Sequence, residues 1–319
     1  MRFTLLLITL CFFFFITSSA QDYDLQTVQK DRSAQGFKGA VMQVTERQWV
    51  PAAGAMPSSA QAPDSSYSLE HSITWVFDSS GRALSVQRRD PDERRRKALT
   101  DTGAVFYYNK GKLVALSTSK ENKRADSVSY RYLRNGLPDQ CLVFDSKDAL
   151  RYKITYAYRN GQVSMLRRKD KDNMVIAMIR YQYNSSGHLV ESRHFDQQLR
   201  LTEIRRYSVR QDSKGEQGSY SVTGADGKMK GGASWVKDAA GRTLEENQVN
   251  GDREVTEFRN YTYGVEADPV SEKTFNAFVE NDITYRYTYD EQQNWIRKEA
   301  YNDVGLLRSV TLRTIRYGH

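Results

Sequence analysis

Residues 179–190 read Ile-Arg-Tyr181-Gln-Tyr183-Asn184-Ser-Ser-Gly187-His-Leu-Val, and this stretch decides the fold. The two tyrosines alternate with polar residues, which puts both rings on one face of a β-strand. Asn184-Ser-Ser-Gly187 has the chemistry of a turn, because short polar side chains bond the local backbone and Gly187 readily adopts positive φ. A second alternating run follows the glycine. The stretch therefore predicts a β-hairpin.

The same outline recurs along the chain, with a degenerate copy at Tyr261-Thr-Tyr263-Gly264. Turn residues end the first strand of each copy, at intervals of 25 to 30 residues up to residue 241 and with a last one two units later. A period of about 26 residues predicts a chain of repeated hairpins. The repeat turns are Gly81, Gly111, Gly136, Gly161, Gly187, Gly215, Gly241 and Asn294.

These repeats predict an all-β fold, an antiparallel meander of about 18 to 20 strands. Open sheets rarely exceed ~10 strands before twist curls them. We therefore expect the sheet to curl into a spiral, a half-shell or a wide barrel-like form, with the tyrosine rows on its concave or packed face. A β-propeller is the main competitor, but its blades need about 40 residues each.

The ends of the chain suggest how it is organised. Met1-Arg2, the apolar run from Phe3 to Ile16 and the small residues ending at Ala20 form a secretory signal peptide. The apolar run is shorter than the ~20 residues that span a bilayer, so no transmembrane segment is expected once residues 1–20 are removed. The expected organisation continues as an N-terminal lead (21–36), a first strand (37–50), a Pro/Ala/Ser-rich loop (51–66) and the repeat domain (67–319). Within this domain, Pro91 to Leu99 is the best helix candidate, although a charged loop is the favoured interpretation, and the glycine-rich residues 214–232 are expected to form a mobile insertion.

Composition excludes several classes of protein. Only two cysteines are present, too few for a disulfide-dense mini-protein or a four-cysteine zinc module, and 39% apolar residues are too many for a disordered chain. Cys11 and Arg2 leave with the signal, so the exported chain keeps Cys141 alone and its net charge falls from +8 to +7. The export signal places the protein in the periplasm, on the outer envelope or outside the cell.

Groups for catalysis are sparse. The four histidines are scattered along the chain. His188 and His194 together with Glu191 weakly suggest a metal site, but exposed residues on opposite strands are the favoured interpretation. Cys141 lies in an apolar run and reads as a small buried residue. Asp170-Lys-Asp172-Asn173 lacks the glycine and distal glutamate of a calcium loop. The sequence therefore predicts no catalytic residue, no metal and no cofactor.

The rows of aromatic residues are the best candidate for a binding surface. They could hold a polysaccharide by stacking or a peptide by edge pairing, or they could be cross-strand pairs that only build the sheet. Recurrence at the repeat period favours the structural interpretation. The residues are Trp75, Phe77, Tyr130, Tyr132, Tyr156, Tyr158, Tyr181, Tyr183, Trp235, Tyr261, Tyr263, Tyr285, Tyr287, Tyr289 and Trp295.

One stretch concentrates basic residues, diluted by Asp90, Asp92 and Glu93. Nucleic acid is not the expected partner of an exported protein, whereas acidic glycans and anionic lipid surfaces are close to it. We interpret the stretch as a surface feature with affinity for the envelope. Its residues are Arg88, Arg89, Arg94, Arg95, Arg96 and Lys97.

Residues 181–189 also resemble a known pattern. Tyr181-X-Tyr183-Asn184-X-X-Gly187-X-Leu189 is similar to the YD repeats of the Rhs family, whose usual form has Asp in place of this Asn. Tyr287-Thr-Tyr289-Asp290 keeps the Asp. The resemblance covers roughly residues 37–317 and implies a β-shell built from repeats. It does not imply a toxin function, because only Gly318 and His319 follow the last repeat.

The sequence thus favours a non-catalytic, exported β-repeat protein that acts as a scaffold or as a binding module for a glycan or a polypeptide. Two alternatives remain open. One is an enzyme that acts on envelope polymers through carboxylates such as Glu191, Glu245 and Glu299. The other is a small container or cap for a partner polypeptide.

Overall fold

The protein is described by a computed structural model that covers residues 36–51, 66–91, 99–120, 123–264, 267–276 and 279–318, without the side chains of residues 90–91 and 99–101. No helix occurs in these residues. The strands in chain order are β1 (Val41–Pro51), β2 (Tyr67–Phe77), β3 (Ala83–Pro91), β4 (Leu99–Asn109), β5 (Lys112–Lys120), β6 (Lys123–Tyr132), β7 (Pro138–Phe144), β8 (Leu150–Arg159), β9 (Gln162–Asp170), β10 (Val175–Tyr183), β11 (Leu189–Phe195), β12 (Leu201–Asp212), β13 (Gly215–Gly224), β14 (Met229–Asp238), β15 (Thr243–Asn250), β16 (Val255–Tyr263), β17 (Pro269–Asn276), β18 (Val279–Tyr289), β19 (Trp295–Asn302) and β20 (Leu307–Tyr317).

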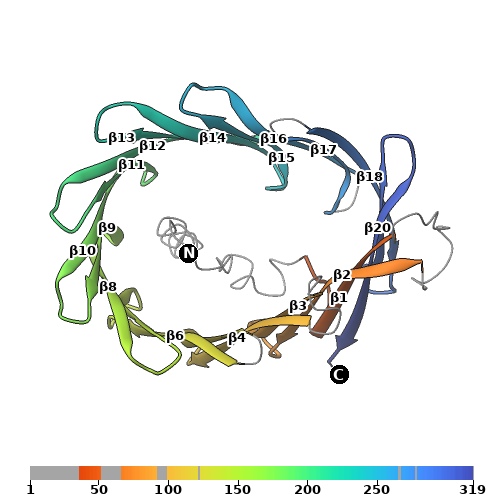
Figure 1. Cartoon of the computed structure of the whole chain (residues 1–319), viewed down its shortest axis with the longest axis horizontal. Coiled ribbons are helices and arrows are strands. Elements are labelled where there is room, and N and C mark those ends of the chain that lie inside the picture. Colours follow the sequence, from red (N-terminus) through yellow and green to blue (C-terminus); the bar gives the residue numbers. More distant parts are fainter. Residues whose placement is uncertain are drawn as a thin grey trace.

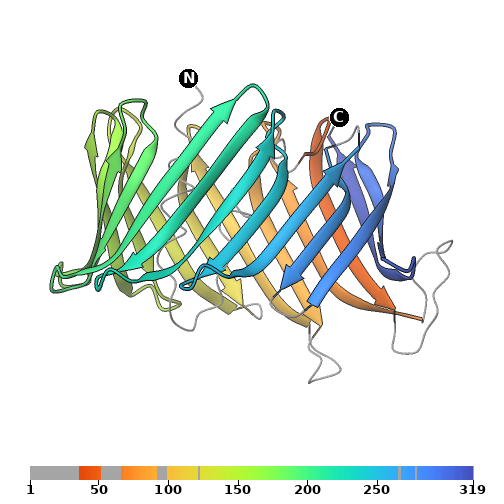
Figure 2. The ribbon, with the colours of Figure 1, turned by 90° about the horizontal axis from the view of Figure 1, so that it is seen from above.

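The strands form one 20-stranded antiparallel sheet that closes on itself. Each strand pairs with its neighbours in the chain, and β1 pairs with both β2 and β20. The seam between β1 and β20 runs from Val41 opposite Tyr317 to Trp49 opposite Val310. Figure 1 shows the result as a flattened ring, and Figure 2 shows its strands tilted against the axis. The predicted all-β meander is confirmed, and among the predicted forms it takes the barrel-like one.

The two faces of the wall differ in burial. In β18, Ile283, Tyr285, Tyr287 and Tyr289 are half-buried, whereas the residues between them are exposed. A closed sheet crowds the side chains on its concave side, so the more buried face is the inner one. Barrels of 16 or more strands are wide enough to leave a lumen between opposite walls. We call the two sides the luminal face and the outer face.

The main core lies on the luminal face near the seam. Phe77 is fully buried and meets Phe37 edge-on, with ring centroids 6.0 Å apart and an interplanar angle of 67°. Val41, Val44 and Trp75 belong to the same cluster. Residues just before β1 are thus packed against the inside of the wall.

The repeat turns lie between the two strands of each hairpin. Positive φ occurs at Gly81, Gly136, Gly187 and Gly241. Each of these glycines is the fourth residue of its turn, and its N–H donates a hydrogen bond to the carbonyl of the first residue. Tight turns at Gly111 and Gly161 also have positive φ, and Gly215 (φ 140) begins β13.

Asn294 differs from its expected role. The positive φ of its turn falls on Gln293 (φ 61). Asn294 is instead buried, and its side chain accepts a hydrogen bond from the Lys38 N–H at 2.7 Å while its amide donates to the Lys38 carbonyl at 2.9 Å and to the Tyr317 hydroxyl at 2.8 Å. The residue ties the chain before β1 to the last strand across the seam.

The glycine-rich residues 214–232 are not an insertion. They form β13 and the start of β14, both fully paired in the wall. Gly218 lies opposite Trp235, and a Cβ atom at Gly218 would come within 2.1 Å of that indole ring. The glycine is needed because the ring lies directly over the backbone of the neighbouring strand.

Several predictions fall on residues outside the described ranges. These are the signal peptide, nearly all of the N-terminal lead and of the loop at 51–66, and the charged stretch at 92–98.

Candidate functional site

All the aromatic residues predicted to form rows lie on the luminal face, in register from strand to strand. Tyr130 is opposite Cys141, Cys141 is opposite Ile154, and Tyr285 is opposite Ala300. Cys141 is 1% exposed, and burial raises the pKa of its thiol to about 12. A thiol in that state is not an available nucleophile at neutral pH.

Five luminal tyrosines each link one hairpin to the one before it. A β-bulge follows the hairpin turn of a unit, and the carbonyl beside this bulge accepts a hydrogen bond from the hydroxyl of a tyrosine in the next unit. The pairs are Tyr132 to Leu113 (2.6 Å), Tyr158 to Pro138 (2.6 Å), Tyr183 to Val163 (3.1 Å), Tyr263 to Thr243 (2.8 Å) and Tyr287 to Pro269 (2.8 Å). These hydroxyls are engaged inside the wall, which gives the repeat a physical reason to keep a tyrosine there.

Replacing Tyr158 with phenylalanine should lower the free energy of unfolding by about 1 kcal/mol, because the Pro138 carbonyl loses its half-buried donor. Chemical denaturation measures the change. Tyr107→Phe is the matched control, since the Tyr107 side chain is half-exposed on the outer face. Equal effects of the two substitutions would contradict the linking role.

A polar cluster occupies the luminal face of β11 and β12. The Ser192 hydroxyl lies 3.1 Å from Nε2 of His194 and 3.4 Å from the Tyr207 hydroxyl, and Glu203 forms an ion pair with Arg205. The set resembles a nucleophile with its base. Ser192, however, is 0% exposed, so a substrate carbonyl has no route to it. The cluster is a satisfied part of the wall.

The cluster makes stability depend on pH. Burial, and then the charge of Arg205, lower the pKa of His194 from 6.5 to about 4. Between these values the unfolded chain binds a proton that the native barrel does not, so the free energy of unfolding should fall by about 3 kcal/mol as the pH drops from 6.5 to 4. His194→Gln should remove this part of the slope in denaturation series, whereas His188→Gln, in an exposed turn, should keep it. An unchanged slope in His194→Gln would contradict the assignment.

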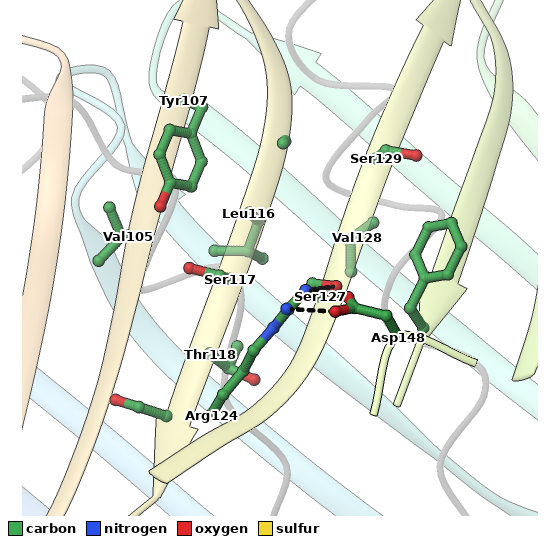
Figure 3. Close-up of a pocket in the computed structure, with 13 residues that line it drawn as sticks. Val105, Tyr107, Leu116, Ser117, Thr118, Arg124, Ser127, Val128, Ser129 and Asp148 are labelled. Atoms are coloured by element: carbon green, nitrogen blue, oxygen red, sulfur yellow. Dashed lines mark hydrogen bonds and ion pairs between the residues drawn. The ribbon is translucent and has the colours of Figure 1, made fainter. Parts of the chain in front are cut away.

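The outer face carries a groove of about 650 Å³ across β4 to β7. Cross-strand partners build it, with bulky side chains toward its ends and small ones between them (Figure 3). One row runs from Val105 over Ser117 and Ser127 to Phe144, and beside it runs a second row of Tyr107, Ala115 and Ser129. With strands about 4.8 Å apart, the walls stand roughly 14 Å from each other.

The groove is open to solvent and offers mixed chemistry. Tyr107 is 50% exposed and Val105 is 42% exposed, large values for side chains in the middle of a sheet. The hydroxyls of Ser117 and Ser129 line the floor. An aromatic wall beside a hydroxyl floor can contact both the apolar face and the polar edge of a ligand.

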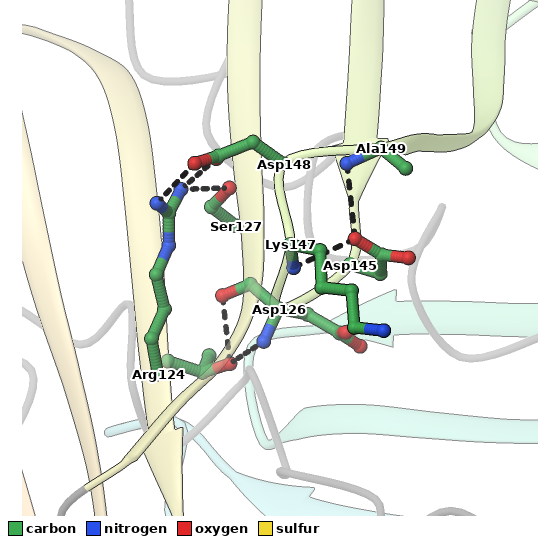
Figure 4. A network of polar contacts seen from close by, with 8 residues as sticks. Arg124, Asp126, Ser127, Asp145, Lys147, Asp148 and Ala149 are labelled. Carbon is green, nitrogen blue, oxygen red and sulfur yellow. Dashed lines mark hydrogen bonds and ion pairs between the residues drawn. The ribbon is translucent and has the colours of Figure 1, made fainter.

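An ion pair and several hydrogen bonds lie at one end of the groove (Figure 4). Asp148 sits at positive φ (62°) in the turn between β7 and β8, which aims its carboxylate at Arg124 of β6; the guanidinium also donates to Ser127 at 2.9 Å. Asp145 begins this turn and accepts hydrogen bonds from the N–H groups of Ala149 and Lys147, which lower the pKa of its carboxyl. The Arg124–Asp148 ion pair thus connects this turn to β6 beside the groove.

The groove was missed in the sequence because its residues alternate with the repeat positions. Tyr107 occupies the middle of Phe106-X-Tyr108, where comparable units have Arg131, Ala157 or Gln182. Serines likewise stand at alternate positions, with Ser117 and Ser119 after Leu116 and with Ser127 and Ser129 on either side of Val128. An aromatic residue at the outward position of one unit, facing serines in the next, was the available signal.

The other sequence candidates are not brought together. Glu191, Glu245 and Glu299 lie on separate strands, and their cross-strand partners Arg206, Asn260 and Val310 all belong to the outer face. Their carboxylates bond Arg193, Asn247 and Arg297. In the described ranges no group of three His, Cys, Asp or Glu side chains could hold a metal ion. Arg88 and Arg89 are exposed, and the rest of the predicted basic stretch lies outside those ranges.

Comparisons with known proteins leave the family open. No protein-family model and no curated protein matches the chain. Among solved structures, a porin-like protein from Bacteroides uniformis is 11% identical with a TM-score of 0.33, over 88% of this chain and 98% of that one. A porin-like protein from Bacteroides vulgatus is 9% identical with a TM-score of 0.22, over 87% and 98%. The Photorhabdus luminescens Tc holotoxin pore is 9% identical with a TM-score of 0.22, over 78% of this chain and 18% of that one.

Likenesses this distant carry no argument about function, and the YD-repeat resemblance stays a prediction. Across the described strands and turns, the chain contains no helix with the length and apolar character needed to cross a membrane.

Proposed function

We propose that the protein is a non-catalytic, exported binding module that holds a glycan chain in the outer groove of β4 to β7. The observation that carries this proposal is the pairing of the exposed Tyr107 ring with a floor of Ser117, Ser127 and Ser129. Sugar rings present an apolar face and hydroxyl edges, and this groove offers a partner for each.

Closure of the barrel favours a glycan over a peptide. Peptides commonly bind to sheets by adding a strand to an exposed edge. Here β1 pairs with β20, so the ring has no edge strand to receive a peptide. Recognition at this wall must therefore use side chains, which suits a ligand with many hydroxyl groups.

The two alternatives have less support. An enzyme would need converging carboxylates, and Glu191, Glu245 and Glu299 are spread around the outer face with each carboxylate engaged. A container would use the lumen, which the closed ring is wide enough to provide. Five of the luminal tyrosine hydroxyls, however, are hydrogen-bonded within the wall, where they link hairpins. The container therefore stays a prediction.

The test is to screen the purified protein against soluble neutral and acidic oligosaccharides and to measure the affinity for those that bind by calorimetry. Tyr107→Ala should weaken binding by about tenfold or more, the loss typical of an aromatic anchor. Ser117→Phe should block the groove and have a similar effect.

Val279→Ala is the control, because Val279 is 55% exposed and does not line the groove. The thermal unfolding midpoint should be unchanged in all three variants. Glycan binding that survives both groove substitutions, or a protein that binds no glycan at all, would contradict the proposal.

A further inference from the structure

Basic residues form a continuous band on the outer face from β8 to β12. Each projects from the same side as the groove, as the register of neighbouring strands requires. We call this band the basic track, and it consists of Lys153, Lys169, Arg167, Arg180, Arg193 and Arg206.

The track contains like charges directly opposite one another. Lys153 is the cross-strand partner of Lys169, and Arg180 is the partner of Arg193. Arg167 joins the two pairs, because its partner Met178 is two residues from Arg180 on the same strand. Like charges directly opposite destabilise a sheet, so these pairs work against the stability of the wall.

Little negative charge balances the track. Glu191 bonds Arg193 at 2.7 Å and Arg206 at 3.3 Å. Within the described part of the chain no ion pair is formed by Lys153, Lys169, Arg167 or Arg180, and the two arginines are exposed. The luminal face differs, since Glu46 pairs with Arg313, Glu203 with Arg205, and Glu216 with Lys237.

The track begins where the groove ends. Phe144 lines the far end of the groove, and Leu142, two residues before it on β7, is the cross-strand partner of Lys153. A chain that follows Tyr107, Ala115 and Ser129 across the groove and continues in the same direction passes Leu142 and crosses Lys153 and Lys169 next. This continuity connects the two surfaces.

We propose that the ligand is an acidic polysaccharide whose carboxylate, sulfate or phosphate groups bind the basic track while its sugar rings lie in the groove. The inference rests on the proposed function and specifies its ligand class. A flexible chain fits better than an anionic bilayer, because β8 to β10 form one end of the flattened ring, where the wall curves round (Figure 1). A planar surface would reach only part of a band that follows this bend.

The experiment compares the triple variant Arg167→Gln/Lys169→Gln/Arg180→Gln with Arg47→Gln/Arg308→Gln/Arg316→Gln. The second triple removes the same charge from exposed outer positions near the seam. The probes are polygalacturonate, heparin and dextran, together with vesicles of phosphatidylcholine alone or mixed with phosphatidylglycerol. Binding is measured at low and at physiological salt.

We expect the wild type to bind an acidic glycan more tightly than dextran, with affinity that falls as salt rises. The track triple should bind the acidic glycan about tenfold more weakly than the wild type does. The control triple should lose less than about threefold, because it lowers only the overall charge. Tyr107→Ala should weaken the binding of neutral and of acidic glycans to the same extent.

Two results would overturn this inference while leaving the groove in place. In the first, acidic and neutral glycans bind with equal affinity and both depend on Tyr107. In the second, the track triple and the control triple lose the same share of affinity for the acidic glycan. Binding to anionic vesicles without binding to acidic glycans would replace the glycan with a lipid surface. Absence of all glycan binding would remove the proposed function as well.

Discussion

Replacing Arg313 with alanine is expected to lower the free energy of unfolding by about 3–5 kcal/mol. The guanidinium is largely buried on the luminal face at the seam, where it donates to Glu46 at 2.9 Å and lies 3.2 Å from the centre of the Trp295 ring. Burial lowers the pKa of Arg313, and the neighbouring Glu46 opposes that shift. Without the arginine, the Glu46 carboxylate would be left without its charge partner in a confined space.

Chemical denaturation measures this loss. The slope of the free energy of unfolding against denaturant concentration should stay unchanged. Arg316→Ala is the matched control, because Arg316 is an exposed outer residue of the same strand and should change stability by less than about 0.5 kcal/mol. Glu46→Gln combined with Arg313→Met should recover most of the loss, since it removes both charges and keeps the volume. A double variant as unstable as Arg313→Ala would show that stacking on Trp295, and not the charge pair, holds the seam.

Replacing Phe77 with alanine is expected to cost about 3–5 kcal/mol, the range for removing a fully buried aromatic side chain. Phe77 is 0% exposed and holds Phe37 against the inside of the wall. The substitution should also expose residues 36–40 to proteolysis, because their packing partner is gone. Limited proteolysis followed by mass spectrometry detects such cuts.

Leu84→Ala is the control for Phe77, since Leu84 is 37% exposed on the neighbouring strand and should change stability by less than about 1 kcal/mol. If Phe77→Ala unfolds at the same denaturant concentration as Leu84→Ala, Phe77 contributes little to the core. Loss of stability without new cuts would show that residues 36–40 are held by Asn294 and not by Phe77.

The fold was predictable because its information is local. Alternation at Tyr181 and Tyr183, followed by Asn184 and Gly187, specifies one hairpin, and repetition specifies the meander. Whether the meander closes depends on contacts between its distant ends, such as Arg313 with Glu46, and no local pattern contains them. The sequence therefore left a spiral, a half-shell and a barrel all open.

The candidate site was not predictable in the same way. Repetition draws attention to the luminal residues, which are shared by every unit and build the wall. The groove and the basic track use outer positions where units differ, as at Tyr107, Arg167 and Arg180. Their proximity depends on cross-strand register, which bulges shift by a residue at many turns, as between Tyr107 and Tyr108. A visible cluster such as Arg94 to Lys97 is easier to find in a sequence than charges brought together from the five strands β8 to β12.

The seam between β1 and β20 also sets the order in which the protein can fold. Every other strand pair joins neighbours in the chain, so hairpins can form early and then pair with one another, whereas the seam joins Val41 to Tyr317, 276 residues further along the chain. The entropy of closing such a long loop makes the seam the last and slowest step. Until that step, β1 and β20 are the edge strands of an open sheet. The unpaired side of each can join another copy of the chain. A barrel that has no edge in its native state must therefore pass through an aggregation-prone open sheet, and dilution or a chaperone that shields β1 and β20 should raise the yield of refolding.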